Sequence, residues 1–201
     1  MIKYEFTETN DKKSKFYYIP NFISIDEQNI IKSHLDSMDD FHPCHNYKKY
    51  SSRSQKWYHS EMKYFFPKWK YRYKRWESFE YDRFLNQIQV KIKNKIDSLG
   101  LTVNLNSCLL NKYNDGNDYI QPHRDSPDSF GEYPVIIGLS IGSSRNINFK
   151  RVKYDPNNIK SMKLEKDSYR NFNYTLESGS IFIMTGSSQK YFVHEIPQSN
   201  T

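Results

Sequence analysis

Apolar residues recur at helical spacing in the first half of the chain. Over residues 79–99 they return every three or four positions, and Gly100 follows as a natural C-cap, so a helix is predicted there. An earlier helix is predicted to begin at Ser24, where Ser24 and Glu27 have the spacing of a capping box, and to end near Ser37.

Strand-like segments make up most of the rest. One over 16–22 precedes the first helix, whereas residues 39–62 are polar and irregular in pattern and predict no regular element. About seven more follow the second helix, over 102–113, 119–125, 135–141, 146–151, 174–176, 180–184 and 191–196. This order predicts an α+β protein with a β-sandwich or jelly-roll core.

Length and charge set broad limits on the function. The 201 residues suffice for one domain with a sizeable core, and a net charge of +7 favours an anionic partner, either nucleic acid or a membrane surface. The chain has neither an apolar run of about 18 residues nor a signal-peptide pattern, so we expect a soluble, intracellular protein of the cytoplasm or the nucleus. Cys44 and Cys108 give no disulfide framework and fit a reducing compartment.

The densest positive charge lies in residues 63–76, KYFFPKWKYRYKRW, which hold six basic and seven aromatic residues and no acidic one. The second half of this segment alternates with period two, so an extended chain would place its basic side chains on one face. We expect that face to contact phosphates through Lys68, Lys70, Arg72 and Lys74. A second basic group either grips another nucleic-acid strand or keeps a loop soluble; it comprises Lys150, Arg151, Lys153, Lys160, Lys163 and Lys166.

Two His-x-Asp triplets are candidates for a metal site, and local geometry separates them. In His34–Asp36, on a predicted helix, the two side chains point about 200° apart and cannot share an ion. In His123–Asp125, on a predicted strand, they lie on one face. With His194 as third ligand this would be the two-His, one-carboxylate triad of non-haem Fe(II) oxygenases. The alternative is that His194 is a packing or surface histidine.

A rival cluster is the segment His42–His45, HPCH, together with His59. It lacks the paired Cys and His spacings that zinc sites usually show. A plain polar loop is the better interpretation.

The segment Asn111–Asp125 resembles the signature N-x-Y-x-x-G-x-D-x-(I/V)-x-x-H-x-D of AlkB-type dioxygenases. Pro134–Gly142 and Leu176–Met184 are similar to two further strands of that family, and Tyr18–Phe22 with the capped helix is similar to its usual start. The likeness therefore extends over most of the chain.

The resemblance implies an Fe(II)- and 2-oxoglutarate-dependent enzyme that uses O2 to dealkylate bases in DNA or RNA, with no membrane and no obligate protein partner. It implies a single domain over 1–201, with helices and a nucleotide-recognition lid over about 1–100 and a double-stranded β-helix core over about 101–201. His123, Asp125 and His194 would be the iron ligands and catalytic centre. Asn111 and Tyr113 would bind 2-oxoglutarate, and Tyr64 and Phe66 would stack on a flipped-out base.

The chain departs from the family after His194. The family places there an R-x-N-x-T-x-R motif whose arginine holds 2-oxoglutarate, but the seven residues after His194 contain no Arg or Lys. We therefore expect the last core strand to be missing. Either the sequence is truncated, or a cation from elsewhere replaces the arginine, or the protein has lost turnover. The alternative functions are a catalytically impaired nucleic-acid-binding relative and a 2-oxoglutarate-dependent protein hydroxylase.

Overall fold

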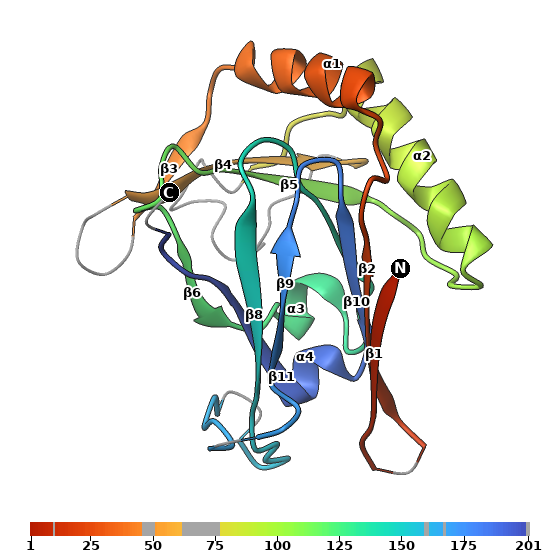
Figure 1. The fold of residues 1–201 in the computed structure, drawn as a ribbon, viewed down its shortest axis with the longest axis vertical. Helices are drawn as coiled ribbons and strands as arrows, with labels where there is room; N and C mark the ends of the chain where they lie inside the picture. The colour runs from red at the N-terminus through yellow and green to blue at the C-terminus, as the bar shows by residue number, and fades with distance from the viewer. Residues whose placement is uncertain (10, 46–50, 62–76, 159–160, 167, 200–201) are drawn as a thin grey trace. The chain divides into compact units, whose positions relative to one another are not determined.

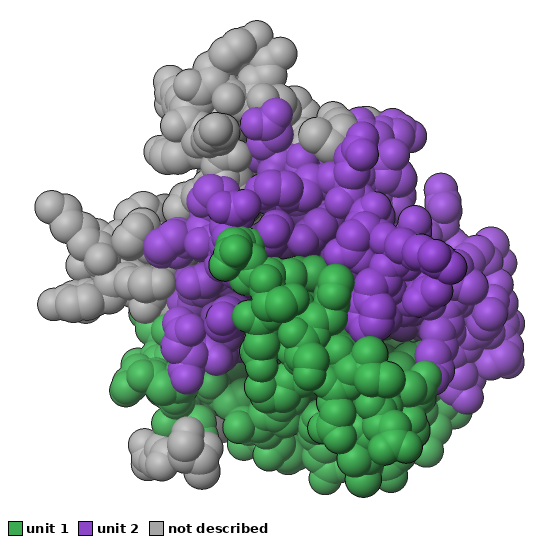
Figure 2. All heavy atoms as spheres, turned by 90° about the horizontal axis from the view of Figure 1, so that it is seen from above, with its two compact units in different colours: residues 1–39, 115–201 green, residues 40–114 purple. Residues whose placement is uncertain are grey.

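The computed structural model describes residues 1–201 except 10, 46–50, 62–76, 159–160, 167 and 200–201. The chain divides into two compact units, unit 1 with residues 1–39 and 115–201 and unit 2 with residues 40–114 (Figure 2). Residues 1–39 thus group with the C-terminal half of the chain. The single domain expected from the sequence stays a prediction.

Unit 1 consists mainly of two four-stranded antiparallel sheets (Figure 1). One has the strand order β1-β2-β10-β7 and the other β6-β11-β8-β9. Their strands are β1 (Ile2–Thr7), β2 (Lys13–Ile19), β6 (Ile120–His123), β7 (Ile136–Leu139), β8 (Arg145–Arg151), β9 (Phe172–Leu176), β10 (Ile181–Gly186) and β11 (Phe192–Ile196). The helices are α1 (Ile25–Asp36), α3 (Pro127–Phe130) and α4 (Ser188–Tyr191).

Aromatic side chains join the two sheets of unit 1. Phe16 on β2 is fully buried, and its ring centroid lies 4.9 Å from that of Phe149 on β8 and 5.0 Å from that of Phe192 on β11. Burial of each such ring contributes about 1.5–3 kcal/mol, and tilted or edge-on ring pairs add to this. The inner faces of both sheets therefore share one aromatic core.

The first helix begins as the sequence predicts. The Ser24 side chain accepts a hydrogen bond from the Glu27 backbone N–H, and the Glu27 carboxylate accepts one from the Ser24 N–H at 3.1 Å. Both halves of the capping box are present, and α1 ends at Asp36 with Ser37 as C-cap. The predicted boundaries of this helix are confirmed.

Unit 2 contains a three-stranded sheet of order β3-β4-β5 and one helix. These elements are β3 (His42–His45), β4 (Ser51–His59), α2 (Arg83–Ser98) and β5 (Ser107–Lys112). The helix starts later than predicted because Asp82 caps it, its side chain accepting from the Leu85 N–H at 2.7 Å.

The prediction that residues 39–62 form no regular element is wrong. β4 pairs antiparallel with β5 from Ser54 to His59 and buries Trp57 and Tyr58. Its sequence, SSRSQKWYH, has weak strand character, so long-range hydrogen bonding to β5 decides its conformation rather than local propensity. β1, which pairs with β2 along its whole length, was likewise not predicted.

The β-rich second half of the chain is confirmed. Each of the seven predicted strand segments overlaps one of β5 to β11; β5 is shorter than its predicted segment, and β8, β9 and β10 extend one or two residues beyond theirs. Jelly-roll connectivity and the nucleotide-recognition lid stay predictions. Among the described residues, no helix is both long and apolar enough to cross a membrane.

Candidate metal centre

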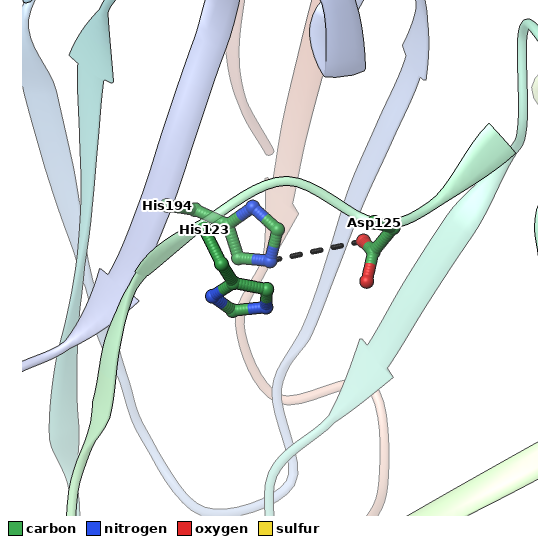
Figure 3. A group of neighbouring side chains, drawn as sticks. All are labelled: His123, Asp125 and His194. Atoms are coloured by element: carbon green, nitrogen blue, oxygen red, sulfur yellow. Dashed lines mark ion pairs between the residues drawn. The ribbon is translucent and has the colours of Figure 1, made fainter. Parts of the chain in front are cut away.

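Three side chains of unit 1 converge on a small volume. The ligand atoms of His123, Asp125 and His194 all lie within 4.8 Å of one another, and Figure 3 shows the three side chains pointing toward a common point. His194 Nε2 lies 3.8 Å from Asp125 Oδ2. The two imidazole ring centroids are 4.2 Å apart.

Strand pairing creates this convergence. His123 ends β6 and lies directly opposite His194 in the antiparallel pair of β6 with β11. Residues opposite each other in such a pair project from the same face with Cβ atoms about 4.5–5.5 Å apart. Asp125 follows two residues later, just beyond the end of β6, and its side chain still reaches the two imidazoles.

Hydrogen bonding and burial prepare both histidines as nitrogen ligands. His123 Nδ1 lies 2.9 Å from the Gln121 carbonyl oxygen, which can only accept, so Nδ1 is the donor of this hydrogen bond and Nε2 is the nitrogen available to a metal. Burial, reinforced by the neighbouring His123, holds the pKa of His194 well below its ordinary value of 6.5. His194 is therefore neutral at physiological pH and able to bind a metal.

Asp125 supplies a carboxylate that the described part of the protein leaves unsatisfied. Its Oδ2 is buried and accepts no hydrogen bond from any described residue. Burial raises the pKa of Asp125, an effect opposed by the nearby His123. A bound cation would relieve the cost of burying this group, and two imidazole nitrogens with one carboxylate form the donor set of non-haem iron sites. The residues present therefore fit Fe(II).

Two neighbouring side chains fix the backbone around Asp125. The buried Gln189 accepts the Asp125 backbone N–H through Oε1 at 2.9 Å, and its Nε2 lies 3.1 Å from Met184 Sδ. Arg124, between the two ligands of the triplet, donates to the Lys190 carbonyl at 3.2 Å and to the Ser161 carbonyl at 2.9 Å. The sequence predicted neither role.

The two predicted 2-oxoglutarate residues belong to unit 2. Asn111 lies on β5, where its Oδ1 accepts from Arg53 Nε at 2.8 Å and from Gln55 Nε2 at 3.1 Å, and Tyr113 follows β5 and is half-buried. These bonds occupy the Asn111 side-chain oxygen. Sequence analysis missed Arg53 and Gln55 because only the pairing of β4 with β5 brings them to Asn111.

The predicted base and phosphate contacts lie outside the described residues; they are Tyr64, Phe66, Lys68, Lys70, Arg72 and Lys74. Of the second basic group, Arg151 is buried and paired with Glu8 at 2.6 Å, and Lys150 is paired with Glu195 at 2.6 Å. Both cations are therefore already paired with carboxylates of the protein. Lys153, Lys163 and Lys166 are exposed, and Lys160 is not among the described residues.

The competing metal candidates do not form a site in the described part of the chain. There, the triad is the one group of three or more His, Cys, Asp or Glu side chains close enough together to hold a metal. His34 and Asp36 on α1 do not belong to such a group, and neither do His42 and His59. The side chains of Cys44 and His45 are not described.

Comparison with known proteins gives the family. The profile of the 2OG-Fe(II) oxygenase superfamily matches residues 15–201. The chain is 28% identical over 102 residues to DNA oxidative demethylase ALKBH2 of Arabidopsis thaliana, which covers 46% of this chain and 32% of that protein. It is 30% identical over 93 residues to alpha-ketoglutarate-dependent dioxygenase alkB homolog 3 of Mus musculus, covering 46% and 31%.

The matched segments span about a third of the length of these curated relatives. The solved structure of OsALKBH1 matches with a TM-score of 0.56 at 12% identity, over 91% of this chain and 85% of that one, a likeness that concerns the fold. Superfamily membership implies Fe(II), 2-oxoglutarate and O2, and the His-Asp-His triad fits the metal. The chain belongs to the 2OG-Fe(II) oxygenase superfamily and is similar in sequence to AlkB homologues of that superfamily.

Proposed function

We propose that the protein is an oxidative demethylase of N-alkylated bases in DNA or RNA, dependent on Fe(II) and 2-oxoglutarate. The observation that carries the proposal is the buried, unsatisfied Asp125 carboxylate beside His123 and His194. The Arabidopsis relative is a DNA oxidative demethylase, and this similarity supports a nucleic-acid substrate.

The triad would hold iron by one face of its coordination octahedron and leave the opposite positions for 2-oxoglutarate and O2. Fe(II) bound there would supply the oxidising power for hydroxylation of an alkyl carbon, with O2 and 2-oxoglutarate consumed and succinate, CO2, an aldehyde and the dealkylated base as products. The residues of the protein position these reactants. Gln121 orients His123, and Gln189 holds the backbone of Asp125.

The resemblance supports the finer assignments. The core would be a double-stranded β-helix within a single domain. Asn111 and Tyr113 would donate hydrogen bonds to 2-oxoglutarate, with Arg53 fixing the Asn111 amide. Tyr64 and Phe66 would stack on the extruded base, and the cations of residues 68–74 would contact the phosphate backbone.

The test is to titrate the Fe(II)-loaded chain with 2-oxoglutarate without oxygen, then admit air with a methylated oligonucleotide. We expect saturable binding, followed by succinate release that the methylated strand stimulates and the same strand without methyl groups does not. Oligonucleotide binding without succinate would instead identify a nucleic-acid binder that lacks turnover. Stimulation by a protein but not by any oligonucleotide would identify a protein hydroxylase.

A further inference from the structure

A short antiparallel pairing continues from the end of β8 in unit 1. Val152 and Leu164 form an antiparallel bridge, flanked by hydrogen bonds from the Lys153 N–H to the Lys163 carbonyl and from the Glu165 N–H to the Arg151 carbonyl, both 2.9 Å. We call residues 151–153 and 163–165 the β8 ribbon. Its register places Arg151 opposite Glu165 and Lys153 opposite Lys163.

The two flanking pairs of the β8 ribbon differ in charge. Arg151 and Glu165 are complementary, with Nε and Oε1 3.4 Å apart. Lys153 and Lys163 are two exposed cations directly across from each other, and like charges in this arrangement are destabilising. Within the described part of the chain, neither lysine forms an ion pair. An anion between them would turn this repulsion into attraction.

The residues after the β8 ribbon suit a nucleic-acid strand. Lys166 adds a third exposed cation. Tyr169 is 86% exposed, with the Arg170 guanidinium carbon 5.5 Å from its ring centroid and Arg170 Nε donating to its hydroxyl at 3.2 Å. An exposed ring held by a guanidinium offers a stacking face for a base, and exposed lysines offer contacts to phosphates.

Two connections relate the β8 ribbon to the metal centre. Phe149 on β8 lies opposite His194, and Lys153 is four residues further along the same strand direction, about 13 Å away at strand rise. Arg124, between the ligands His123 and Asp125, donates to the Ser161 carbonyl, two residues before Lys163. The cations therefore lie within a few nucleotides of the base that reacts.

We propose that Lys153 and Lys163, assisted by Lys166, bind phosphates of the nucleic-acid strand whose base is placed at the triad, and that Tyr169 stacks on a base of that strand. This inference rests on the proposed nucleic-acid substrate. The protein would then have two regions that bind nucleic acid, this surface on unit 1 and the basic segment at residues 63–76.

The decisive variant is Lys163→Glu, because it moves stability and binding in opposite directions. Across from Lys153 the new carboxylate forms a complementary pair, so the thermal midpoint stays equal or rises. Affinity for a fluorescein-labelled single-stranded DNA of about 16 nucleotides should fall about tenfold near 0.1 M salt. The slope of log affinity against log salt should become shallower by about 0.7–1. A variant with a merely structural effect would not show this combination.

The matched control is Lys32→Glu, which makes the same charge change at an exposed position on α1, where Lys32 pairs with Asp36. It should leave DNA affinity and salt slope near those of the unaltered chain. The double variant Lys153→Gln with Lys163→Gln should reduce the slope by about 1.4, two phosphate contacts' worth.

Three outcomes would overturn the inference. If the unaltered chain binds DNA and Lys163→Glu behaves like Lys32→Glu, the β8 ribbon is not a phosphate site while the proposed function stands. If the unaltered chain binds no oligonucleotide at any salt concentration, the inference and the proposed substrate fail together. If Lys163→Glu weakens binding to vesicles containing an anionic lipid but not to DNA, the surface serves a membrane.

Discussion

Two groups of ionisable side chains buried in unit 1 are partnered in opposite ways. Glu8, whose side chain is fully buried, accepts a hydrogen bond from Arg151 Nη1 at 2.8 Å through Oε1, and its Oε2 lies 2.6 Å from Arg151 Nη2 as an ion pair without hydrogen-bond geometry. Arg170 adds a second cation 3.6 Å from Glu8. In the triad, by contrast, the buried Asp125 Oδ2 accepts no hydrogen bond from a described residue and faces two imidazoles.

The difference separates a structural charge cluster from a binding site. The negative charge of Glu8 is balanced by the guanidinium groups of Arg151 and Arg170, so no external cation is needed at that position. The triad has a carboxylate that burial disfavours and imidazole lone pairs aimed at the same point. Such groups persist where a ligand completes them, which is why perturbed, incompletely satisfied clusters mark functional sites.

The largest expected effect is on catalysis, from Asp125→Asn. The amide keeps the shape of the carboxylate but removes the anionic ligand itself. Loss of a residue that only hydrogen-bonds to a ligand costs up to roughly 100-fold in metal affinity, so the loss of Asp125 should cost more. Succinate formation should drop to background. Visible absorption during titration with Co(II) measures the affinity directly, and retention of tight binding would mean that Asp125 is not a ligand.

Without metal, Asp125→Asn should leave the chain more stable. Because burial raises the pKa of Asp125, its ionised form destabilises the fold, and this cost grows as pH rises from below 3.8 through the folded-state pKa. The gain in unfolding free energy from Asp125→Asn should therefore be greater near neutral pH than in acid. Urea titrations with a chelator at both pH values measure it, and an equal gain would contradict the assignment.

Glu8, Arg151 and Arg170 form what we call the paired cluster, and we expect it to respond in the opposite way to the loss of one partner. Arg151→Met leaves Glu8 buried with only Arg170 nearby, and breaking a buried pair costs about 3–5 kcal/mol of unfolding free energy. Metal affinity should stay unchanged. The double variant Glu8→Met with Arg151→Met should recover most of the loss, because the charges that then lose a partner, Arg170 and Glu165, are partly exposed to solvent. Urea titration checks all three proteins, and a double variant no better than Arg151→Met would mean that the pair itself is needed.

Gln189 offers a smaller test on the metal side of the comparison. Gln189→Leu removes the acceptor of the Asp125 backbone N–H, and loss of such a supporting bond costs about 10–100-fold in metal affinity. The matched control is Met184→Leu, which removes the sulfur near Gln189 Nε2 and leaves the bond to Asp125 intact. Co(II) titration should give a much lower metal affinity for Gln189→Leu than for Met184→Leu. Equal affinities would mean that Gln189 contributes only to packing.

The triad and the paired cluster also differ in how far the sequence predicts them. His123 and Asp125 are two residues apart, so strand geometry alone suggested a shared face, and the signature over Asn111–Asp125 supported them as ligands with His194 as the third. Glu8 and Arg151 are 143 positions apart and carry no motif. The sequence analysis grouped Arg151 with the free surface cations, and only the fold shows that it is buried and paired.

The same limit applies to the elements. α1 was predicted to within a residue because its capping box is local, whereas β4 depends on β5, some fifty residues further along the chain. Arg53 and Gln55 could not be linked to Asn111 without that pairing. The sequence therefore predicts interactions within a few residues or within a known signature, and misses those created by long-range strand pairing.

The smallest effect is expected at the edge of the paired cluster. Glu165 lies 3.4 Å from Arg151 Nε, but its side chain is 35% exposed and Arg151 already has Glu8. Glu165→Gln should therefore cost under about 1 kcal/mol, as partly exposed ion pairs do, which corresponds to a lowering of the thermal midpoint by about 2–4 °C at most. Calorimetry beside Arg151→Met gives the contrast. A loss for Glu165→Gln as large as that of Arg151→Met would show that Arg151 depends on both carboxylates, and that its pairing with Glu8 alone does not account for the stability of this cluster.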